Sequence, residues 1–170
     1  MKKIMTFICL TTVIGINASG VGQSNFSVCF SPAGQCDIKI NSFAAAAKST
    51  VDIAIYSLTL PSFAQTLVKL SQSGVKIRIV ADKSEAKSPS SLIASLVKAG
   101  IPTKFGNVRG IMHNKFMIID GRMLETGSFN YTTNATAANA ENQIYLDNPD
   151  VVAQYHAQFE LLWVNGIPPQ

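Results

Sequence analysis

The sequence has few of the side chains from which metal centres are built. It contains two histidines and three cysteines among 170 residues. Neither histidine has a cysteine or an acidic residue near it at the spacing of a metal-binding motif. We therefore predict a protein that needs no metal ion and no other cofactor.

Charge is scarce as well. Asp, Glu, Lys and Arg together make up 14% of the residues, and the formal net charge is +4. Loss of Lys2 and Lys3 with a signal peptide would leave 12 basic and 10 acidic residues, a net charge of +2. This small positive net charge permits a polyanionic partner but argues against a histone-like protein that binds through charge alone.

Long apolar runs are absent after residue 20. Residues 4–16 are apolar apart from threonines, a cysteine and a glycine; they follow Lys2 and Lys3 and precede small residues at 18–20. The run is shorter than the roughly 18 to 20 residues that a membrane-spanning helix needs. We expect residues 1–20 to be a signal peptide, with an uncleaved anchor as the alternative. The protein would then be exported, periplasmic or secreted, with no stable membrane insertion after cleavage.

Residues 21–170 have the length of one domain. No linker, repeat or low-complexity stretch divides them, and about 150 residues can bury a core of their own. Two cysteines, Cys29 and Cys36, remain in this part and would meet an oxidising compartment after export. A disulfide between them and two separately buried thiols both stay open.

The pattern of apolar residues predicts an α/β fold. Alternating or continuous apolar runs predict strands, and apolar residues three and four apart predict helices. Gly74 and Gly100 each follow a predicted helix, as C-terminal caps do. The arrangement favours a single domain in which a mixed β-sheet is flanked by helices on both faces. The strands are expected at 27–30, 50–57, 75–81, 103–105, 114–119, 123–126 and 143–146, and the helices at 37–48, 62–73, 88–99 and 149–164.

The segment from His113 to Asp120 contains the residues best suited to chemistry. Side chains alternate along a strand, so His113 and Lys115 should project from the same face at the strand entrance. Residues 116–119 form an apolar run, as expected of a strand buried on both faces. This pairs a nucleophilic imidazole with a fixed positive charge.

A second polar group follows the next predicted strand. The hydroxyl of Ser128 and the amide of Asn130 can donate hydrogen bonds to phosphate oxygens, and Gly127 lets the backbone approach closely. A phosphodiesterase needs a nucleophile for phosphorus, positive charge for the non-bridging oxygens and an acid for the leaving oxygen. The two segments together supply the nucleophile and the positive charge.

The pattern His-x-Lys-x4-Asp-x6-Gly-Ser-x-Asn resembles the signature of the phospholipase D superfamily. The whole predicted domain is similar to the small, secreted, Nuc-type bacterial endonucleases of that group. The resemblance implies a phospholipase D-like fold, a phosphohistidine intermediate, no metal ion and two motif copies around one active site. It also implies that Glu141 matches the carboxylate that binds the outer nitrogen of the histidine. Asp120, at the far end of the strand, is expected to orient the motif and not to contact phosphorus.

Only one copy of the motif is present. An in-line displacement places the acid for the leaving group opposite the nucleophile, so one His113 cannot serve both positions in the same step. We therefore predict a homodimer in which two copies of the chain form one composite site about a two-fold axis. One neutral and one cationic imidazole would then give a bell-shaped dependence of activity on pH.

Three functions are considered. The first is a metal-independent endonuclease that hydrolyses DNA, with RNA as a further substrate. Its sequence specificity should be low, since nothing resembles a base-reading element. The second is a phospholipid-hydrolysing phospholipase D, against which no amphipathic docking stretch or insertion for an acyl pocket is found. The third is a secreted nucleic-acid-binding protein without catalysis, which the complete motif disfavours.

Three other basic side chains lie outside the motif. His156 on the last predicted helix is expected to be structural. Lys104 and Arg109 precede the motif and either line a groove for neighbouring phosphates or are ordinary surface charges.

Overall fold

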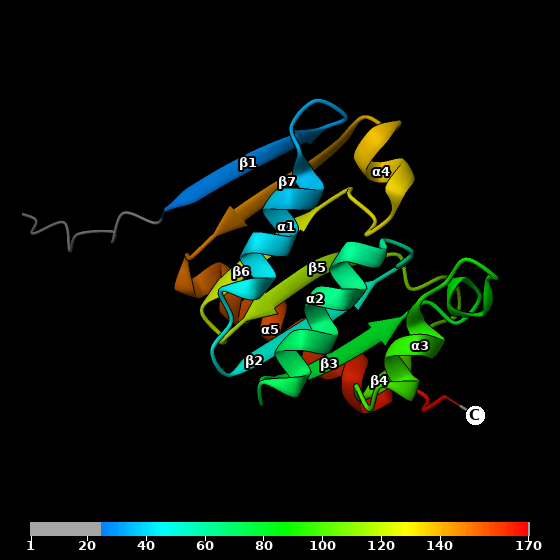
Figure 1. The fold of residues 1–170 in the computed structure, drawn as a ribbon. Helices are drawn as coiled ribbons and strands as arrows, with labels where there is room; N and C mark the ends of the chain where they lie inside the picture. The colour runs from blue at the N-terminus through cyan, green and yellow to red at the C-terminus, as the bar shows by residue number, and fades with distance from the viewer. Residues whose placement is uncertain (1–24, 170) are drawn as a thin grey trace, which may run out of the picture.

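The computed structural model describes residues 25–169, so the predicted signal peptide lies outside the described residues. In this part of the chain, no helix is long and apolar enough to cross a membrane. Seven strands form one sheet in the order β1-β7-β6-β5-β2-β3-β4 (Figure 1). They are β1 (Phe26–Ser31), β2 (Thr50–Ile55), β3 (Lys76–Ala81), β4 (Thr103–Phe105), β5 (Lys115–Ile119), β6 (Met123–Gly127) and β7 (Glu141–Leu146).

The sheet is mixed, and helices lie on both of its faces. β2, β3 and β4 are parallel, whereas β5, β6, β7 and β1 continue the sheet in antiparallel pairs. Figure 1 shows α1 and α2 in front of the sheet and α5 behind it. The predicted fold class is therefore confirmed. The helices are α1 (Cys36–Ala45), α2 (Pro61–Gln72), α3 (Ile93–Lys98), α4 (Thr133–Ala137) and α5 (Pro149–Asn165), with a short 3-10 helix at Glu85–Lys87.

Each face of the sheet has its own core. On the side of α1, α2 and α3, Ile53, Phe63 and Met117 belong to one buried cluster. On the side of α5, Phe116 and Phe159 belong to the other. Alternation along β5 therefore sends successive side chains into the two cores, which explains the continuous apolar run in its sequence.

The helix predicted from residue 88 begins later than expected, at Ile93. The preceding serines form turns: the backbone N–H of Ser91 donates to the carbonyl oxygen of Ser88 over 2.9 Å. The hydroxyls of Ser88 and Ser90 are hydrogen-bonded to each other over 3.1 Å. Serine side chains compete with helical hydrogen bonds in this way, and apolar spacing does not register the competition.

Cys29 and Cys36 form a disulfide, with their Cα atoms 5.7 Å apart. Of the two alternatives that the sequence left open, the structure contains the bridge. It joins β1, at the edge of the sheet, to the first residue of α1. The edge strand is therefore held by a covalent bond as well as by its pairing with β7.

Strand register brings the motif segments to one end of the sheet. Lys115 lies opposite Ile55, Phe116 opposite Thr126, and Gly127 opposite Gln143. The last residues of β2 and β6 therefore lie beside the first residues of β5 and β7. All of them are at the side of the sheet toward which the arrow of β3 points in Figure 1. Ligands of open α/β sheets bind at this end, beyond the carboxyl ends of the parallel strands.

Candidate active site

His113 is exposed at the entrance to β5. Its ring meets the ring of Tyr56 edge to face, with centroids 4.5 Å apart and an angle of 62° between the planes. Tyr56 directly follows β2, and its backbone N–H donates to the carbonyl oxygen of Asn114 over 2.9 Å. This bond extends the β2–β5 pairing past the strand ends, so the imidazole stands on a fixed backbone with one side open to solvent.

Asp82 fixes the segment in front of His113. It directly follows β3 and is buried, and its carboxylate accepts a hydrogen bond from the backbone N–H of Met112 over 3.0 Å. The hydroxyl and N–H of Ser84 donate to the other carboxylate oxygen over 2.5 and 2.9 Å. Burial alone would raise the pKa of Asp82, but these hydrogen bonds lower it, so the carboxylate stays ionised. Sequence analysis missed this residue, although an acidic residue directly after a parallel strand was a usable signal.

Lys115 is buried beside the imidazole. Its Nζ donates to the carbonyl oxygen of His113 over 2.8 Å and lies 5.1 Å from the centroid of the Tyr56 ring. Burial lowers the pKa of Lys115, and the negative charge of Glu141 opposes that effect. The ammonium group is thus held in place and weakly hydrated, which strengthens its attraction for an anion.

Ser128 and Glu141 are paired at the neighbouring strand ends. The Ser128 hydroxyl donates to the Glu141 carboxylate and accepts the backbone N–H of Asn142 over 3.1 Å. Asn139 donates its side-chain N–H to the other oxygen of Glu141 over 3.0 Å. Among the described residues these are the partners of Glu141, and the expected contact with His113 is not formed within one chain.

Two residues beside Ser128 explain the spacing of the Gly-Ser-x-Asn segment. A Cβ atom on Gly127 would collide with the backbone carbonyl oxygen of Asn142, so the close approach predicted for this glycine is required by β7. Asn130 has a buried side-chain oxygen that has no hydrogen-bond partner in the described part of the chain. A buried carbonyl oxygen without a donor is costly, and only a ligand or water that donates a hydrogen bond can satisfy it.

The loop that carries Asn130 rests on a buried carboxyl group. The Tyr131 hydroxyl donates to Glu125 over 2.7 Å, and both side chains are fully buried. The backbone of Tyr131 also bonds to Ser57 and Thr59, in the segment that follows β2. Burial raises the pKa of Glu125 to about 8, although the hydrogen bond from Tyr131 lowers it.

Asp120 lies at the other end of β5 from His113. Its carboxylate accepts the backbone N–H groups of Lys48, Ser49 and Thr50 over 2.7–3.1 Å, and the Ser49 hydroxyl over 2.8 Å. Burial would raise the pKa of Asp120, but these hydrogen bonds lower it to about 2. The residue therefore ties the end of β5 to the start of β2. Of the six predicted site residues, the structure brings His113, Lys115, Ser128, Asn130 and Glu141 together and leaves Asp120 apart.

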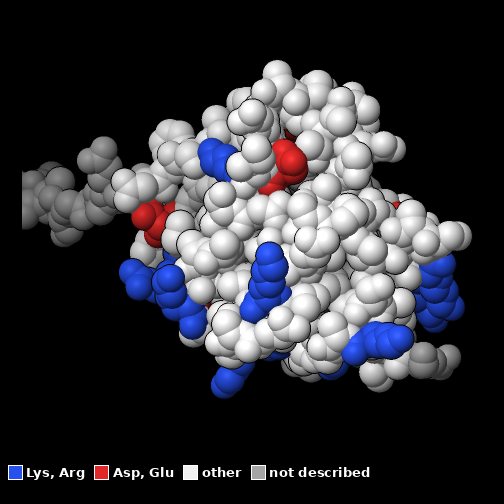
Figure 2. All heavy atoms as spheres, viewed as in Figure 1, with Lys and Arg blue, Asp and Glu red and all other residues white. Residues whose placement is uncertain are grey.

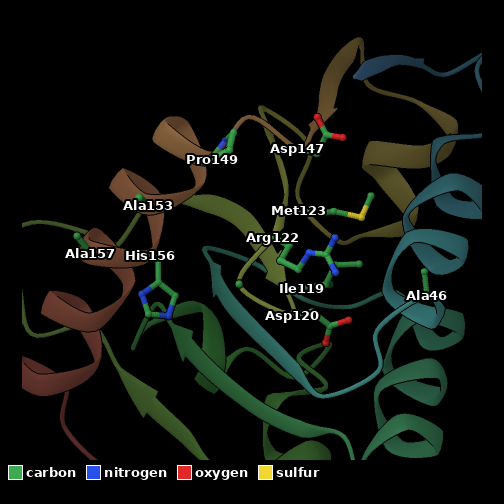
Figure 3. Close-up of a pocket in the computed structure, with 11 residues that line it drawn as sticks. Ala46, Ile119, Asp120, Arg122, Met123, Asp147, Pro149, Ala153, His156 and Ala157 are labelled. Carbon is green, nitrogen blue, oxygen red and sulfur yellow. The ribbon is translucent and has the colours of Figure 1, made fainter. Parts of the chain in front are cut away.

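His156 lies in a different environment, near the pocket of Figure 3 at the far end of β5. Its Nε2 is 3.9 Å from Asp52 and 3.8 Å from Glu160. Glu160 is one helical turn from His156, so the statement that no acidic residue lies at ligand spacing near a histidine was wrong. The guanidinium of Arg78 binds both carboxylates, at 2.7 and 2.6 Å, and opposes a metal cation there. We assign the cluster a structural role.

The two remaining basic residues differ from each other. The Nζ of Lys104 donates to the carbonyl oxygen of Trp163 over 2.7 Å, so this side chain is held against α5 and does not line a groove. Arg109 is exposed in the loop before His113. Figure 2 shows basic side chains scattered over the visible face and none over α4, in agreement with the small net charge.

Comparisons with known proteins identify the family of this chain. Residues 40–163 match the family model described as "Cardiolipin synthase, PLD-like domain". The chain is 38% identical over 117 residues to a mitochondrial cardiolipin hydrolase of Chlamydomonas reinhardtii, covering 69% of this chain and 52% of that protein. It is 33% identical over 139 residues to a phospholipase D of Rickettsia conorii, covering 82% and 70%. The chain thus spans about half the length of the cardiolipin hydrolases it matches.

Solved structures show the same likeness. The fold matches that of Nuc from Salmonella typhimurium, a phospholipase D family member, with a TM-score of 0.82 and 28% identity. The match covers 87% of this chain and 99% of Nuc. NucT from Helicobacter pylori matches with a TM-score of 0.81 at 24% identity, which shows the shared fold.

Proposed function

This chain belongs to the phospholipase D superfamily, and we propose that it is a phosphodiesterase whose nucleophile is His113. One observation carries the proposal. An exposed imidazole just before β5, a buried ammonium group on β5, and a hydroxyl and a side-chain amide just after β6 gather at one end of a rigid sheet. Such a set can attack phosphorus and hold the charge of its oxygens without a metal ion.

The proposed reaction has two steps. A ring nitrogen of His113 attacks phosphorus, so that a P–N bond forms while the P–O bond to the leaving group breaks. Lys115 supplies positive charge to the non-bridging oxygens, and the side-chain N–H of Asn130 donates a hydrogen bond to them. The Ser128 hydroxyl can donate to them once its proton turns from Glu141 to the phosphate. Water then attacks the phosphohistidine, and the P–N bond breaks to release the phosphate monoester.

Proton transfer in both steps needs a second group opposite the nucleophile. We assign it to the partner's His113, which protonates the leaving oxygen in the first step and takes a proton from water in the second. The active species is then a homodimer with one composite site. Glu141 is close enough to lower the free energy of the positive charge on Lys115, and its bond to Ser128 orients that hydroxyl.

The substrate that we favour is nucleic acid, cut with low sequence specificity. Two observations support this choice. The structural match covers 87% of this chain and 99% of Nuc, so the described residues contain no large insertion into that fold that could form an acyl pocket. In addition, His113 stands exposed at the sheet end, where an extended phosphate backbone can pass. Residues 1–20 would act as a signal peptide and place the enzyme in the periplasm or outside the cell.

A phospholipid is the second candidate substrate. Several curated relatives that match over 69% of this chain are named mitochondrial cardiolipin hydrolases, and two are named phospholipase D. The reacting group in such a lipid is the same phosphodiester, so the site chemistry described above applies without change.

One pair of assays separates the two substrates. The purified protein is incubated with plasmid DNA in EDTA and, separately, with vesicles that contain cardiolipin. Nicking of the plasmid supports the endonuclease, whereas release of phosphatidate alone supports the lipid hydrolase. His113→Asn should abolish the activity that is found, and His156→Asn, which changes the other histidine, should retain it. A wild-type protein inert in both assays would contradict the proposal.

A further inference from the structure

Tyr56 contacts two of the motif side chains on which the proposed reaction depends. Its ring centroid lies 4.5 Å from that of the His113 imidazole and 5.1 Å from the Nζ of Lys115. In the described part of the chain, the hydrogen bond of His113 runs through its backbone carbonyl oxygen, and none involves the imidazole nitrogens. Within one chain, the plane of the imidazole is therefore set by an edge-to-face contact, a geometry that aromatic pairs prefer.

The backbone under the Tyr56 ring is held from two sides. On one side its N–H donates to the carbonyl oxygen of Asn114 over 2.9 Å. On the other, the carbonyl oxygen of Ser57 accepts the N–H of Tyr131 over 3.1 Å, and Leu58 forms a β-bridge with the same residue. None of these bonds uses the phenol ring. A substitution at this position therefore removes the ring and leaves the backbone connections of the site in place.

The hydroxyl end of Tyr56 lies near a carboxylate from another loop. The negative charge of Glu85 raises the pKa of Tyr56, and burial and the charge of Asp82 raise it further. Glu85 begins the short 3-10 helix after β3, and its backbone N–H donates to Asp82 over 3.1 Å. The other carboxylate oxygen of Asp82 accepts the N–H of Met112, directly before His113. One buried carboxylate thus ties the turn of Glu85 to the segment of the nucleophile.

We propose that Tyr56 is a positioning residue for the phosphodiesterase reaction, whose ring holds the His113 imidazole and the Lys115 ammonium group in a fixed relation, while Glu85 holds the ring. A nucleophile must stand about 3–3.5 Å from the atom it attacks, and a displacement of about 1 Å can slow a reaction by about a hundredfold. The negative face of a phenol ring also attracts an ammonium group, which offsets part of the hydration that a buried lysine has lost. The inference rests on the proposed function, because it needs His113 as the nucleophile.

A direct chemical role for the Tyr56 hydroxyl is the alternative. A phenol with a raised pKa keeps its proton more tightly, so it is a poorer acid for a leaving oxygen at neutral pH. The two roles differ in what a phenylalanine would do. Tyr56→Phe keeps the ring that contacts His113 and Lys115 and removes only the hydroxyl.

Steady-state kinetics with bis(p-nitrophenyl) phosphate separate these roles. This small diester contains neither a nucleobase nor an acyl chain, so the result does not depend on which natural substrate is correct. Tyr56→Leu should lower kcat by about tenfold or more and change KM by less than about threefold, because positioning matters most in the transition state. Tyr56→Met is a second variant without the ring. Tyr56→Phe should keep at least about a third of kcat.

A double-mutant cycle tests the part of Glu85. Glu85→Gln should lower kcat by about twofold to fivefold when Tyr56 is present, because the ring loses its charged partner. In the Tyr56→Phe background the same substitution should have no further effect, since no hydroxyl remains for it to act on. Equal effects of Glu85→Gln in both backgrounds would overturn the link between Glu85 and the ring.

Proton NMR of the imidazole gives a readout that needs no activity. The chain has two histidines, so His156→Asn in an untagged protein leaves His113 as the only source of imidazole resonances. A neighbouring aromatic ring shifts these resonances, so Tyr56→Leu should move them and Tyr56→Phe should retain them. Tyr155→Leu is the matched control, because Tyr155 makes a similar edge-to-face contact with Phe116, at 5.1 Å and 83°. It should leave both the resonances and kcat unchanged.

The outcomes separate this inference from the proposed function. Folded variants without the ring that are slow and have shifted resonances, with both properties restored by phenylalanine, support it. Variants without the ring that react at the wild-type rate overturn the inference and leave the proposed function standing. Tyr56→Phe as slow as Tyr56→Leu assigns the role to the hydroxyl and overturns it as well. A wild type inert toward the diester contradicts the proposed function, and the inference with it.

Discussion

Replacing Glu125 by glutamine should flatten the dependence of stability on pH. The folded chain holds this carboxyl group fully buried with a pKa of about 8, against 4.5 for an unperturbed glutamate. The difference corresponds to about 5 kcal/mol of unfolding free energy. Because folding favours the neutral form, this contribution is fully present below pH 4.5 and is lost as the pH rises toward 8.

The effect is large because small domains are stable by only about 5–15 kcal/mol. Glutamine keeps an oxygen that can accept the Tyr131 hydroxyl but cannot ionise. We therefore expect wild type to lose most of its stability between pH 5 and pH 9, and Glu125→Gln to lose much less over the same range. At pH 5 the two proteins should differ by about 1 kcal/mol, the scale of one altered hydrogen bond.

Urea denaturation at pH 5, 7 and 9 measures the pH dependence of stability. The midpoint of unfolding reports the unfolding free energy as long as its slope against urea concentration stays constant. Tyr131→Phe is the matched control. It removes the donor to Glu125 but leaves the carboxyl group buried, so the pH dependence should persist. Parallel curves for wild type and Glu125→Gln would refute the assignment of a neutral buried carboxyl group.

Three further predictions concern the site and its supports. Asp120→Asn should destabilise the chain by about 1–2 kcal/mol at neutral pH after allowance for solvent screening. Because folding lowers the pKa of this carboxyl group, the difference in unfolding free energy should vanish as the pH falls from 3.8 to about 2, which urea titration measures. Gly127→Ala should cost about 1–3 kcal/mol in thermal melts, because the new methyl group must displace the Asn142 carbonyl; an unchanged melting temperature would argue against that packing. Asp82→Asn should lower kcat by roughly tenfold to a hundredfold with little change in KM, since the segment before His113 loses the charged acceptor of the Met112 backbone N–H, and Asp82→Glu should restore part of the rate.

Periodicity and motif spacing predicted most of the fold and the strand ends at which the six candidate site residues lie, whereas the roles of those residues stay predictions. The strand from 114 to 119 and the turn at Gly121 fix where His113 and Lys115 stand, and these are local properties of the chain. The late start of α3 was missed because serine turns resemble helix starts when only residue types are considered. The position of Asp120 at the far end of the strand follows from counting residues along it.

Asp82 and Tyr56 were missed for a different reason. Each follows a parallel strand, and they join His113 only because β5 pairs with β2 and β3 lies beside β2. Strand order is a property of the whole sheet and is not encoded in any one segment. The contact of Glu141 with Ser128 was missed likewise, since it arises from the pairing of β6 with β7, whereas Asn139 lies only two residues before Glu141 in the chain.

The last helix shows how a second apolar face can stay hidden in a sequence. Val152, Phe159 and Leu162 of α5 are buried against the sheet. Leu161 and Val164 are apolar residues that lie outside this buried face. In the sequence alone they weaken the amphipathic pattern of the helix. Once the face of α5 that packs on the sheet is known, these two side chains are seen to lie outside the core of the chain.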